Sequence, residues 1–446
     1  MALLTAPTPS VRTDPRARLG SRAGGWLRST PGRLTTWTVL LAVLGILAGT
    51  AAVVGITQRT ALVDAVGSRS GPLTVRAQQL YRSLSDADAT AASAFLSNGV
   101  EPAALRERYQ ADLASAAAAL GALTAGTDTN RAATDRVDIA RISAQLPVYA
   151  GLVETARTYN RLGKPLGAAY LREASGLMRT ELLPAAKRLY TAVTDQLRAD
   201  RAGGAEFPWL AVPLLLGTLA GLVLVQRYLS RRTHRLLNVG LLVATGAAVV
   251  TLGWSMVVWV NVGNHLDAGQ RAGSSQVDLL AQARIAALAA RADESLTLIA
   301  RGGGDFDADY DQSMKLLSGD GQGGLLAQVR QQASDPAVRS AVTAAQSHVK
   351  QWRAAHQTLR EKDKGGDYLS AVTLAIGAGP DSAETAFTAL DTDLATAIAG
   401  ADRVFDRQAR AAGNGFTGAA AGHLVLTLLL LASLVAGLWR RIAEYR

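Results

Sequence analysis

The chain has 446 residues, a formal net charge of +10 at pH 7 and no cysteine. Without cysteine it has neither disulfides nor thiolate metal sites, so any folded domain outside the cytoplasm is held by packing alone. The positive charge does not indicate a nucleic-acid partner, because much of the excess arginine lies in short segments beside apolar runs.

Four apolar runs without Asp, Glu, Lys or Arg interrupt the chain, at about 38–56, 207–225, 236–260 and 419–439. A run of roughly 19 residues makes a helix about 28 Å long, close to the thickness of the hydrocarbon core of a bilayer. The runs therefore predict four transmembrane helices. A cleaved signal peptide would also begin with arginines and an apolar run, but this run continues past the small residues 49–52.

Arginines gather before the first run, between the second and third, and after the fourth. Short basic loops stay in the cytoplasm, so both termini are predicted to lie inside, at the cell membrane. The predicted order is an Arg-rich disordered cytoplasmic tail (1–33), a span (34–57), extracytoplasmic bundle A (58–206), a span (207–226), a basic cytoplasmic turn (227–235), a span (236–261), extracytoplasmic bundle B (262–418), a span (419–439) and a cytoplasmic stub (440–446).

Apolar residues in the two long outer segments recur at spacings of three, four and seven, without the alternation typical of strands. This periodicity predicts an all-α fold in which each outer segment is an antiparallel four-helix bundle. The last helix of each bundle is expected to run into the span that follows it, with a joint at Gly203-Gly204 in the first bundle and near Gly413-Gly415 in the second. Examples of the apolar stripes are Leu171, Ala174, Met178 and Leu182 in bundle A, and Phe387, Leu390, Leu394 and Ile398 in bundle B.

The order of span, outer domain and span occurs twice, which indicates an internal repeat. Short matches support it, since Ala87-Asp88-Ala89-Thr90 in bundle A is echoed by Ala292-Asp293-Glu294-Ser295 in bundle B. The plan is similar to the outer sensing bundles of bacterial chemoreceptors and histidine kinases. Asp88, Thr90 and Asp293 are the candidate contacts for an outer partner or ligand; the alternative is ordinary polarity of a helix surface.

Other patterns predict no catalytic, cofactor or metal site, so the chain is not expected to be an enzyme. Asp305, Asp307 and Asp309 begin like a calcium loop, but Tyr310 and Leu316 stand where that loop needs glycine and glutamate. The glycine-rich stretch 319–324 follows no apolar strand. The histidines show no ligand spacing.

Two stretches look characteristic of a known family: YRSLSDADATAASAFL at 81–96 and NRLGKPLGAAYL at 160–171. With them, the layout of essentially the whole chain resembles the GlnX family of four-pass actinobacterial membrane proteins. The resemblance implies a relay in which the lipoprotein GlnH captures aspartate or glutamate outside. The Ser/Thr kinase PknG would then receive the signal inside and adjust metabolism.

The leading interpretation is therefore a relay between an amino-acid-binding lipoprotein and a cytoplasmic Ser/Thr kinase or adaptor, in contact with the lipid bilayer. Candidate contacts for the inner partner are Arg231, Arg232, Arg235, Arg440 and Arg441; setting topology and binding anionic lipid is their alternative role. A scaffold or envelope-assembly factor and a direct small-molecule sensor of chemoreceptor type stay open. Bundles of this kind often pair, so a homodimer also stays open.

Overall fold

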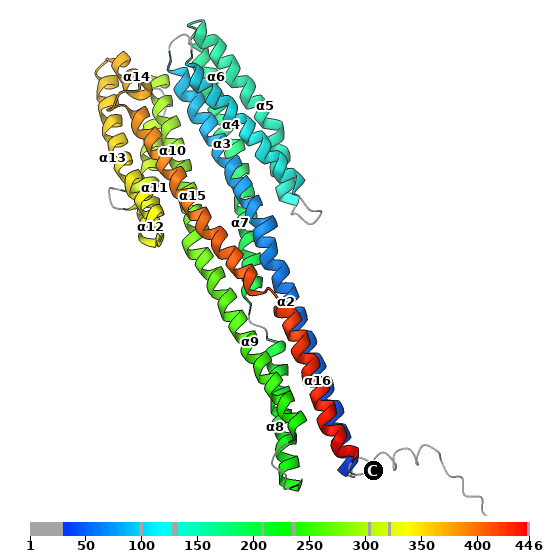
Figure 1. The fold of residues 1–446 in the computed structure, drawn as a ribbon. Coiled ribbons are helices and arrows are strands. Elements are labelled where there is room, and N and C mark those ends of the chain that lie inside the picture. The colour runs from blue at the N-terminus through cyan, green and yellow to red at the C-terminus, as the bar shows by residue number, and fades with distance from the viewer. Residues whose placement is uncertain are drawn as a thin grey trace, which may run out of the picture. The chain divides into compact units, whose positions relative to one another are not determined.

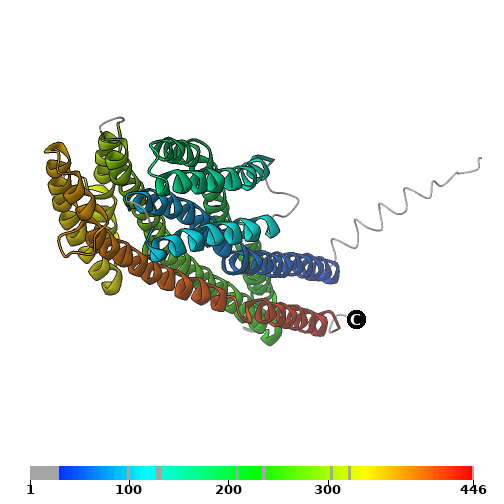
Figure 2. The same ribbon diagram turned by 90° about the horizontal axis from the view of Figure 1, so that it is seen from above.

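A computed structural model of the chain describes residues 30–97, 101–126, 133–206, 209–233, 238–301, 305–319 and 323–443. Across these residues both views draw coiled ribbon and no strand (Figure 1, Figure 2). The predicted all-α fold is thereby confirmed. The chain divides into two compact units: a span unit (1–60, 206–261 and 415–446) and an outer unit (61–205 and 262–414).

The span unit contains the membrane-length helices. Among the described residues four helices are long and apolar enough to cross a membrane, which confirms a multi-pass membrane protein. Residues 207–208 and 234–237, at the edges of the second and third predicted spans, lie outside the described residues. Helix α8 continues to Thr233, so most of the segment expected as a turn at 227–235 is helical. The helices are α2 (Thr30–Ala65), α8 (Ala211–Thr233), α9 (Val239–Gly269) and α16 (Ala419–Ala443).

Small residues let the helices of the span unit approach closely. A Cβ added at Gly240 of α9 would lie 2.5 Å from the Cα of Gly437 in α16. At the same crossing Asn238 donates a hydrogen bond to the Gly437 carbonyl over 2.9 Å. A Cβ at Gly49 of α2 would lie 2.4 Å from a Thr427 methyl group of α16. In lipid the hydrophobic effect does not drive helices together, so close packing and interhelical hydrogen bonds of this kind stabilise their association.

The first half of the outer unit (61–205) has four rods around one core. Helix α4 packs along α3, α6 packs along α5, and α7 packs on α3 and α5. The fourth rod is α6, a π-helical turn η2 and α7 in unbroken succession. Leu84, Tyr109, Ile142, Tyr149 and Leu189 are among the core residues. The elements are η1 (Val66–Ser70), α3 (Gly71–Phe95), α4 (Ala103–Ala125), α5 (Ala133–Arg161), α6 (Leu166–Leu177), η2 (Met178–Leu182) and α7 (Leu183–Ala205).

The second half (262–414) has more breaks than expected, with six α-helices among its described residues. One break lies between α11 and α12, where Gly319 and Gly324 have φ angles of +61° and +76°. A Cβ at Gly324 would lie 2.6 Å from the nitrogen of Gly319, so only glycine fits this turn. The elements are η3 (Gln270–Ser274), α10 (Ser275–Ala300), α11 (Phe306–Ser318), α12 (Gly324–Gln332), α13 (Pro336–Lys364), α14 (Tyr368–Ile376) and α15 (Ala383–Gly415).

The first helix of each half is continuous with a membrane-length helix, without a turn between them. Helical structure runs unbroken from Thr30 to Phe95 and from Val239 to Ala300. The last helices end at Ala205 and Gly415, before α8 and α16 begin. Gly418, with φ of +75°, stands in the turn before α16 and adopts a left-handed conformation that ends a helix. In the second half, α15 and α16 together form one long helical stretch, Ala383–Trp439, with a turn at residues 416–418 close to the joint expected at Gly413-Gly415. Between α7 and α8 the described residues do not test the expectation.

Candidate functional site

The candidate site lies where α3 of the first half packs against α10 of the second half. We call this contact surface the seam. Residues 83–94 of α3 and 290–298 of α10 are buried on every face of their helices. Each helix is enclosed by its own bundle on one side and by the opposite half on the other. Ala89 accordingly belongs to the core of the second half, and Leu296 to the core of the first.

All three outer candidate residues are buried in this seam region. Asp88, Thr90 and Asp293 are 4%, 5% and 1% exposed. The alternative reading of these residues as ordinary surface polarity is therefore wrong. They expose too little surface for a protein partner to contact, although Asp88 and Asp293 line a cleft between the halves. Beside them, the hydroxyls of Ser93 and Ser295 form a hydrogen bond of 3.2 Å across the seam.

Asp88 is held inside the first half by two hydroxyl groups. Ser175 donates a hydrogen bond to one carboxyl oxygen over 2.8 Å, and Tyr149 donates to the other over 3.4 Å. Burial raises the pKa of Asp88 above its usual value, although the charge of Arg179 and the two hydrogen bonds oppose the shift. Burial and the charge of Arg179 therefore act in opposite directions on the pKa of Asp88, and burial is the larger effect.

Arg179 connects the two halves. It stands on η2, a π-helical turn of a kind often found at functional sites. Its guanidinium forms an ion pair of 2.5 Å with Asp293 and lies 3.7 Å from Asp309. Burial raises the pKa of Asp293 to about 6; Arg179 opposes this shift, whereas Asp309 and Asp88 add to it. The single cation Arg179 therefore interacts electrostatically with three carboxyl groups, Asp88 in the first half and Asp293 and Asp309 in the second.

These groups line an open cleft of about 360 Å3. The carboxyl groups outnumber the single arginine, so the cleft carries surplus negative charge whenever Asp293 is ionised. Protonation of Asp293, or a shift of Arg179 from Asp293 to Asp309, would change the ion pair that joins the two halves. The lining residues are Tyr81, Ser85, Asp88, Arg179, Leu183, Ile285, Leu288, Ala289, Ala292, Asp293, Asp309, Gln312, Ser313 and Leu316.

A second charged cluster joins the halves on another side of α3. Arg108 of α4 lies 2.8 Å from Asp86 and 4.0 Å from Asp391 of α15. Arg284 pairs with Asp391 over 2.5 Å. Burial, with Asp86 beside it, raises the pKa of Asp112 to about 7. Sequence reasoning missed this cluster because its members come from four helices and show no common spacing.

A third charged group is closed within the second half, next to Asp293 along α10. Glu294 is fully buried and accepts hydrogen bonds from Arg291 (2.5 Å), His356 (2.9 Å) and the Trp352 indole (3.2 Å). Burial would raise the pKa of Glu294, but the bonds from His356 and Arg291 outweigh it and lower the pKa. Tyr310 stacks on His356 with ring centroids 3.7 Å apart. This group fastens α10 to its own bundle.

The inner candidate arginines are not assembled into a site by the described residues. Arg231 is exposed on α8. Arg232 on α8, and Arg440 and Arg441 on α16, have side chains outside the described part of the chain, and Arg235 lies outside it altogether.

Residues 62–202 match the family model of the actinobacterial sensor domain. The matched segment covers almost all of the first half, including Asp88, Ser175 and Arg179. No curated protein matched the chain, and no solved structure matched it. The first half of the outer unit is thus similar to an actinobacterial sensor domain, and this similarity supports a sensing role for a multi-pass membrane protein.

Proposed function

We propose that this protein is a transmembrane sensory relay without catalytic activity of its own. In this proposal the outer unit responds to an amino-acid-binding lipoprotein loaded with aspartate or glutamate. Both termini lie in the cytoplasm, where a Ser/Thr kinase or its adaptor receives the signal. The similarity of residues 62–202 to a sensor domain supports the sensing role. The lipoprotein and the kinase follow from the resemblance to the GlnX family.

One observation carries the proposal: α3 and α10 meet across a charged seam, and each is continuous with a membrane-length helix. Interfaces between parts of one chain allow relative motion unless they are large and apolar. Here the hydroxyl pair Ser93–Ser295 joins the two helices, and the ion pair Arg179–Asp293 joins α10 to η2 beside them. A shift of α3 against α10 would be carried along the same rods into α2 and α9.

A partner shifts such an equilibrium only if it binds one arrangement of the seam better than the other. A change from mostly one state to mostly the other requires about 5.5 kcal/mol of differential affinity. The buried position of Asp88 and Asp293 means that the partner binds elsewhere on the outer unit and acts on the seam through the helices. Exposed apolar side chains, such as Leu162 in the turn after α5 and Leu369 in the first turn of α14, are available for that contact.

The chain's lack of cysteine permits a direct test of seam motion. Ser93→Cys and Ser295→Cys would place two thiols where the hydroxyls now lie 3.2 Å apart. We expect the oxidised double variant to fix kinase activity in one state, whether or not aspartate or glutamate is present. Reduction should restore the response, and each single variant should respond normally. An unaltered response from the oxidised double variant, with the crosslink verified, would contradict the relay through the seam.

The partners require a separate experiment in cells. A photo-crosslinking residue at Leu162 or Leu369 should capture an amino-acid-binding lipoprotein, and one at Arg231 should capture a Ser/Thr kinase or adaptor. Val137, exposed at the other end of α5 from Leu162, is the matched control position. Capture of envelope-assembly proteins only, with a normal yield of crosslinking, would favour a scaffold and reject the proposed partners.

A further inference from the structure

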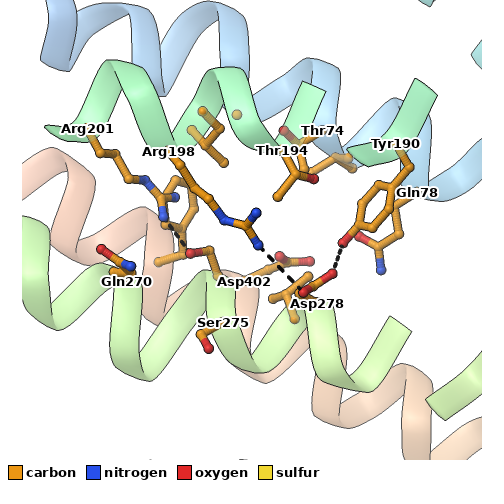
Figure 3. Close-up of a pocket in the computed structure, with 16 residues that line it drawn as sticks. Thr74, Gln78, Tyr190, Thr194, Arg198, Arg201, Gln270, Ser275, Asp278 and Asp402 are labelled. Carbon is orange, nitrogen blue, oxygen red and sulfur yellow. Dashed lines mark hydrogen bonds and ion pairs between the residues drawn. The ribbon is translucent and has the colours of Figure 1, made fainter. Parts of the chain in front are cut away.

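A pocket of about 130 Å3 lies between four helices of the outer unit, away from the cleft around Arg179 (Figure 3). Helices α3 and α7 of the first half form part of its wall, and α10 and α15 of the second half form the rest. The labelled side chains in Figure 3 mix both charges with hydroxyl and amide groups. They are Thr74, Gln78, Tyr190, Thr194, Arg198, Arg201, Gln270, Ser275, Asp278 and Asp402.

Arg201 is the unusual member of this pocket. The residue is 6% exposed, and its Nη2 atom is buried with no hydrogen-bond partner in the described part of the chain. Nη1 donates to Ser274 over 2.5 Å, and the guanidinium lies over the Phe405 ring, 4.5 Å from its centroid. Among the described residues no carboxyl group forms an ion pair with Arg201. Burial lowers its pKa to about 10, so the side chain remains a cation at neutral pH.

An uncompensated buried charge is costly, and native proteins pair such charges or use them to bind a counter-ion. Two buried polar atoms of the lining residues, Nη2 of Arg201 and the hydroxyl oxygen of Thr194, have no hydrogen-bond partner in the described chain. The stack on Phe405 holds the guanidinium plane in place without neutralising it. A carboxylate is the ligand group that this geometry fits best.

The opposite charge is available in the same pocket. Asp402 of α15 lines it, is half-buried and forms no ion pair among the described residues. Burial, together with Asp406, raises the pKa of Asp402 to about 6, so the carboxyl is mostly ionised at pH 7. Arg198 and Asp278, by contrast, already have partners in Asp195 and Tyr190. Among the described lining residues, the two charged groups without an ion pair or a hydrogen-bonded acidic or basic partner are therefore one cation, Arg201, and one anion, Asp402.

We infer that this pocket binds a small zwitterion directly, with its carboxylate on Arg201 and its ammonium group on Asp402. A cavity of about 150 Å3 accommodates benzene, so one slightly smaller takes a molecule of about six heavy atoms. The remaining apolar wall includes Val75, Leu197 and Val277 and suits a short aliphatic side chain. No second protein is needed, so the inference is independent of the proposed lipoprotein.

The position of the pocket couples a ligand to the backbone at π-helical turns. Ser274, which accepts the bond from Arg201, ends η3, and Gly71 follows directly after η1. A Cβ at Gly273 would lie 2.7 Å from the Cβ of Phe405, so the η3 backbone packs against the backbone of the residue whose ring lies under Arg201. A ligand that draws Arg201 toward itself thereby acts on Ser274 and Phe405 together.

The test is calorimetric titration of the full chain in nanodiscs of neutral phosphatidylcholine. Alanine carries both groups, propionate lacks the ammonium group, and ethylamine lacks the carboxylate. We expect alanine to bind at least tenfold more tightly than either analogue. Arg201→Gln should weaken alanine at least tenfold, and Asp402→Asn should remove the preference for alanine over propionate. The control is Arg188→Gln, which replaces an exposed arginine on the same helix. It should change neither the alanine affinity nor the preference for alanine over propionate.

Other outcomes overturn the inference. Binding of alanine and propionate with equal affinity would reject the zwitterion, as would no binding of any probe. Unchanged alanine affinity in folded Arg201→Gln would show that Arg201 is structural only. Displacement of alanine by inorganic phosphate or by anionic lipid, with tighter binding than alanine, would assign the pocket to a phosphate group. If Arg201→Gln fails to fold, the test rests on Asp402→Asn: an unchanged preference for alanine over propionate in this variant would reject the inference.

Discussion

Arg179 and Asp293 form an ion pair of 2.5 Å that crosses from one half of the outer unit to the other. Arg179 stands on the π-helical turn η2, and Asp293 stands on the enclosed face of α10. The pair is asymmetric, because Asp293 is almost fully buried whereas the Arg179 side chain is 28% exposed. Removing the arginine therefore leaves a buried carboxylate, whereas removing the carboxylate leaves a cation that can reach water.

This asymmetry predicts that removing the Arg179 charge destabilises the protein more than removing the Asp293 charge. We expect Arg179→Gln to lower the free energy of unfolding by about 2 kcal/mol at pH 7.5, since the unpaired Asp293 keeps its desolvation cost. The double variant with Asp293→Asn should recover most of the loss. Thermal unfolding of the full chain in detergent measures both. Arg141→Gln, which breaks an exposed pair with Glu181, is the control and should cost less than about 1 kcal/mol.

Asp112 predicts a pH dependence of stability. Its pKa is raised to about 7 in the folded chain, so the native state holds a proton that the unfolded state releases near pH 4. The resulting stabilisation is fully present below about pH 4 and is lost as the pH rises through about 7. Asp112→Asn should therefore raise the unfolding temperature at pH 8 more than at pH 5, by the equivalent of about 2 kcal/mol. Parallel pH profiles of the two proteins would contradict the assigned pKa.

Glu294 predicts a large loss of stability that is local to the second half. Glu294→Gln keeps the shape but removes the charge that pairs with Arg291 and accepts from His356. Arg291 keeps its ion pair with Glu384, so the loss of the Glu294 charge from this buried group should cost about 2 kcal/mol. Thermal unfolding would measure the loss of stability, and faster hydrogen exchange in α10 and α13 would show that the loss is local to these helices. Glu181→Gln, at an exposed pair in the first half, should leave exchange in these helices unchanged.

The close approach of α9 and α16 at Gly240 and Gly437 predicts that a larger residue at Gly240 lowers the stability of the protein. Gly240→Ala places a methyl group 2.5 Å from the Cα of Gly437, so the helices must separate. We expect a loss of about 1–3 kcal/mol, measured by unfolding in detergent. Gly246 lies on the same helix, and a Cβ there meets nothing within 4 Å. Gly246→Ala should therefore leave stability unchanged or raise it by up to about 1 kcal/mol. Equal effects of the two substitutions would argue against this crossing.

Several features of the protein follow from local sequence. The membrane-length helices were predictable because hydropathy is summed over neighbouring residues, and α16 begins at Ala419, as the apolar run predicts. The helical class of the outer unit was predictable because spacings of three and four place apolar residues on one face. The internal match between Ala87–Thr90 and Ala292–Ser295 pointed to the two helices that meet in the seam.

Only the tertiary structure decided what those helices contact. Asp88 and Asp293 look like surface residues in sequence, because polar residues on an amphipathic helix usually face water. They are buried because α3 and α10 each have a second neighbour, the opposite half, which no local pattern records. Arg179 and Arg201 reach their sites from the fourth rod of the first half, far along the chain from Asp293 and Phe405. Hydropathy and periodicity are properties of neighbours in sequence, whereas the pairing of charges depends on which helices lie side by side in space.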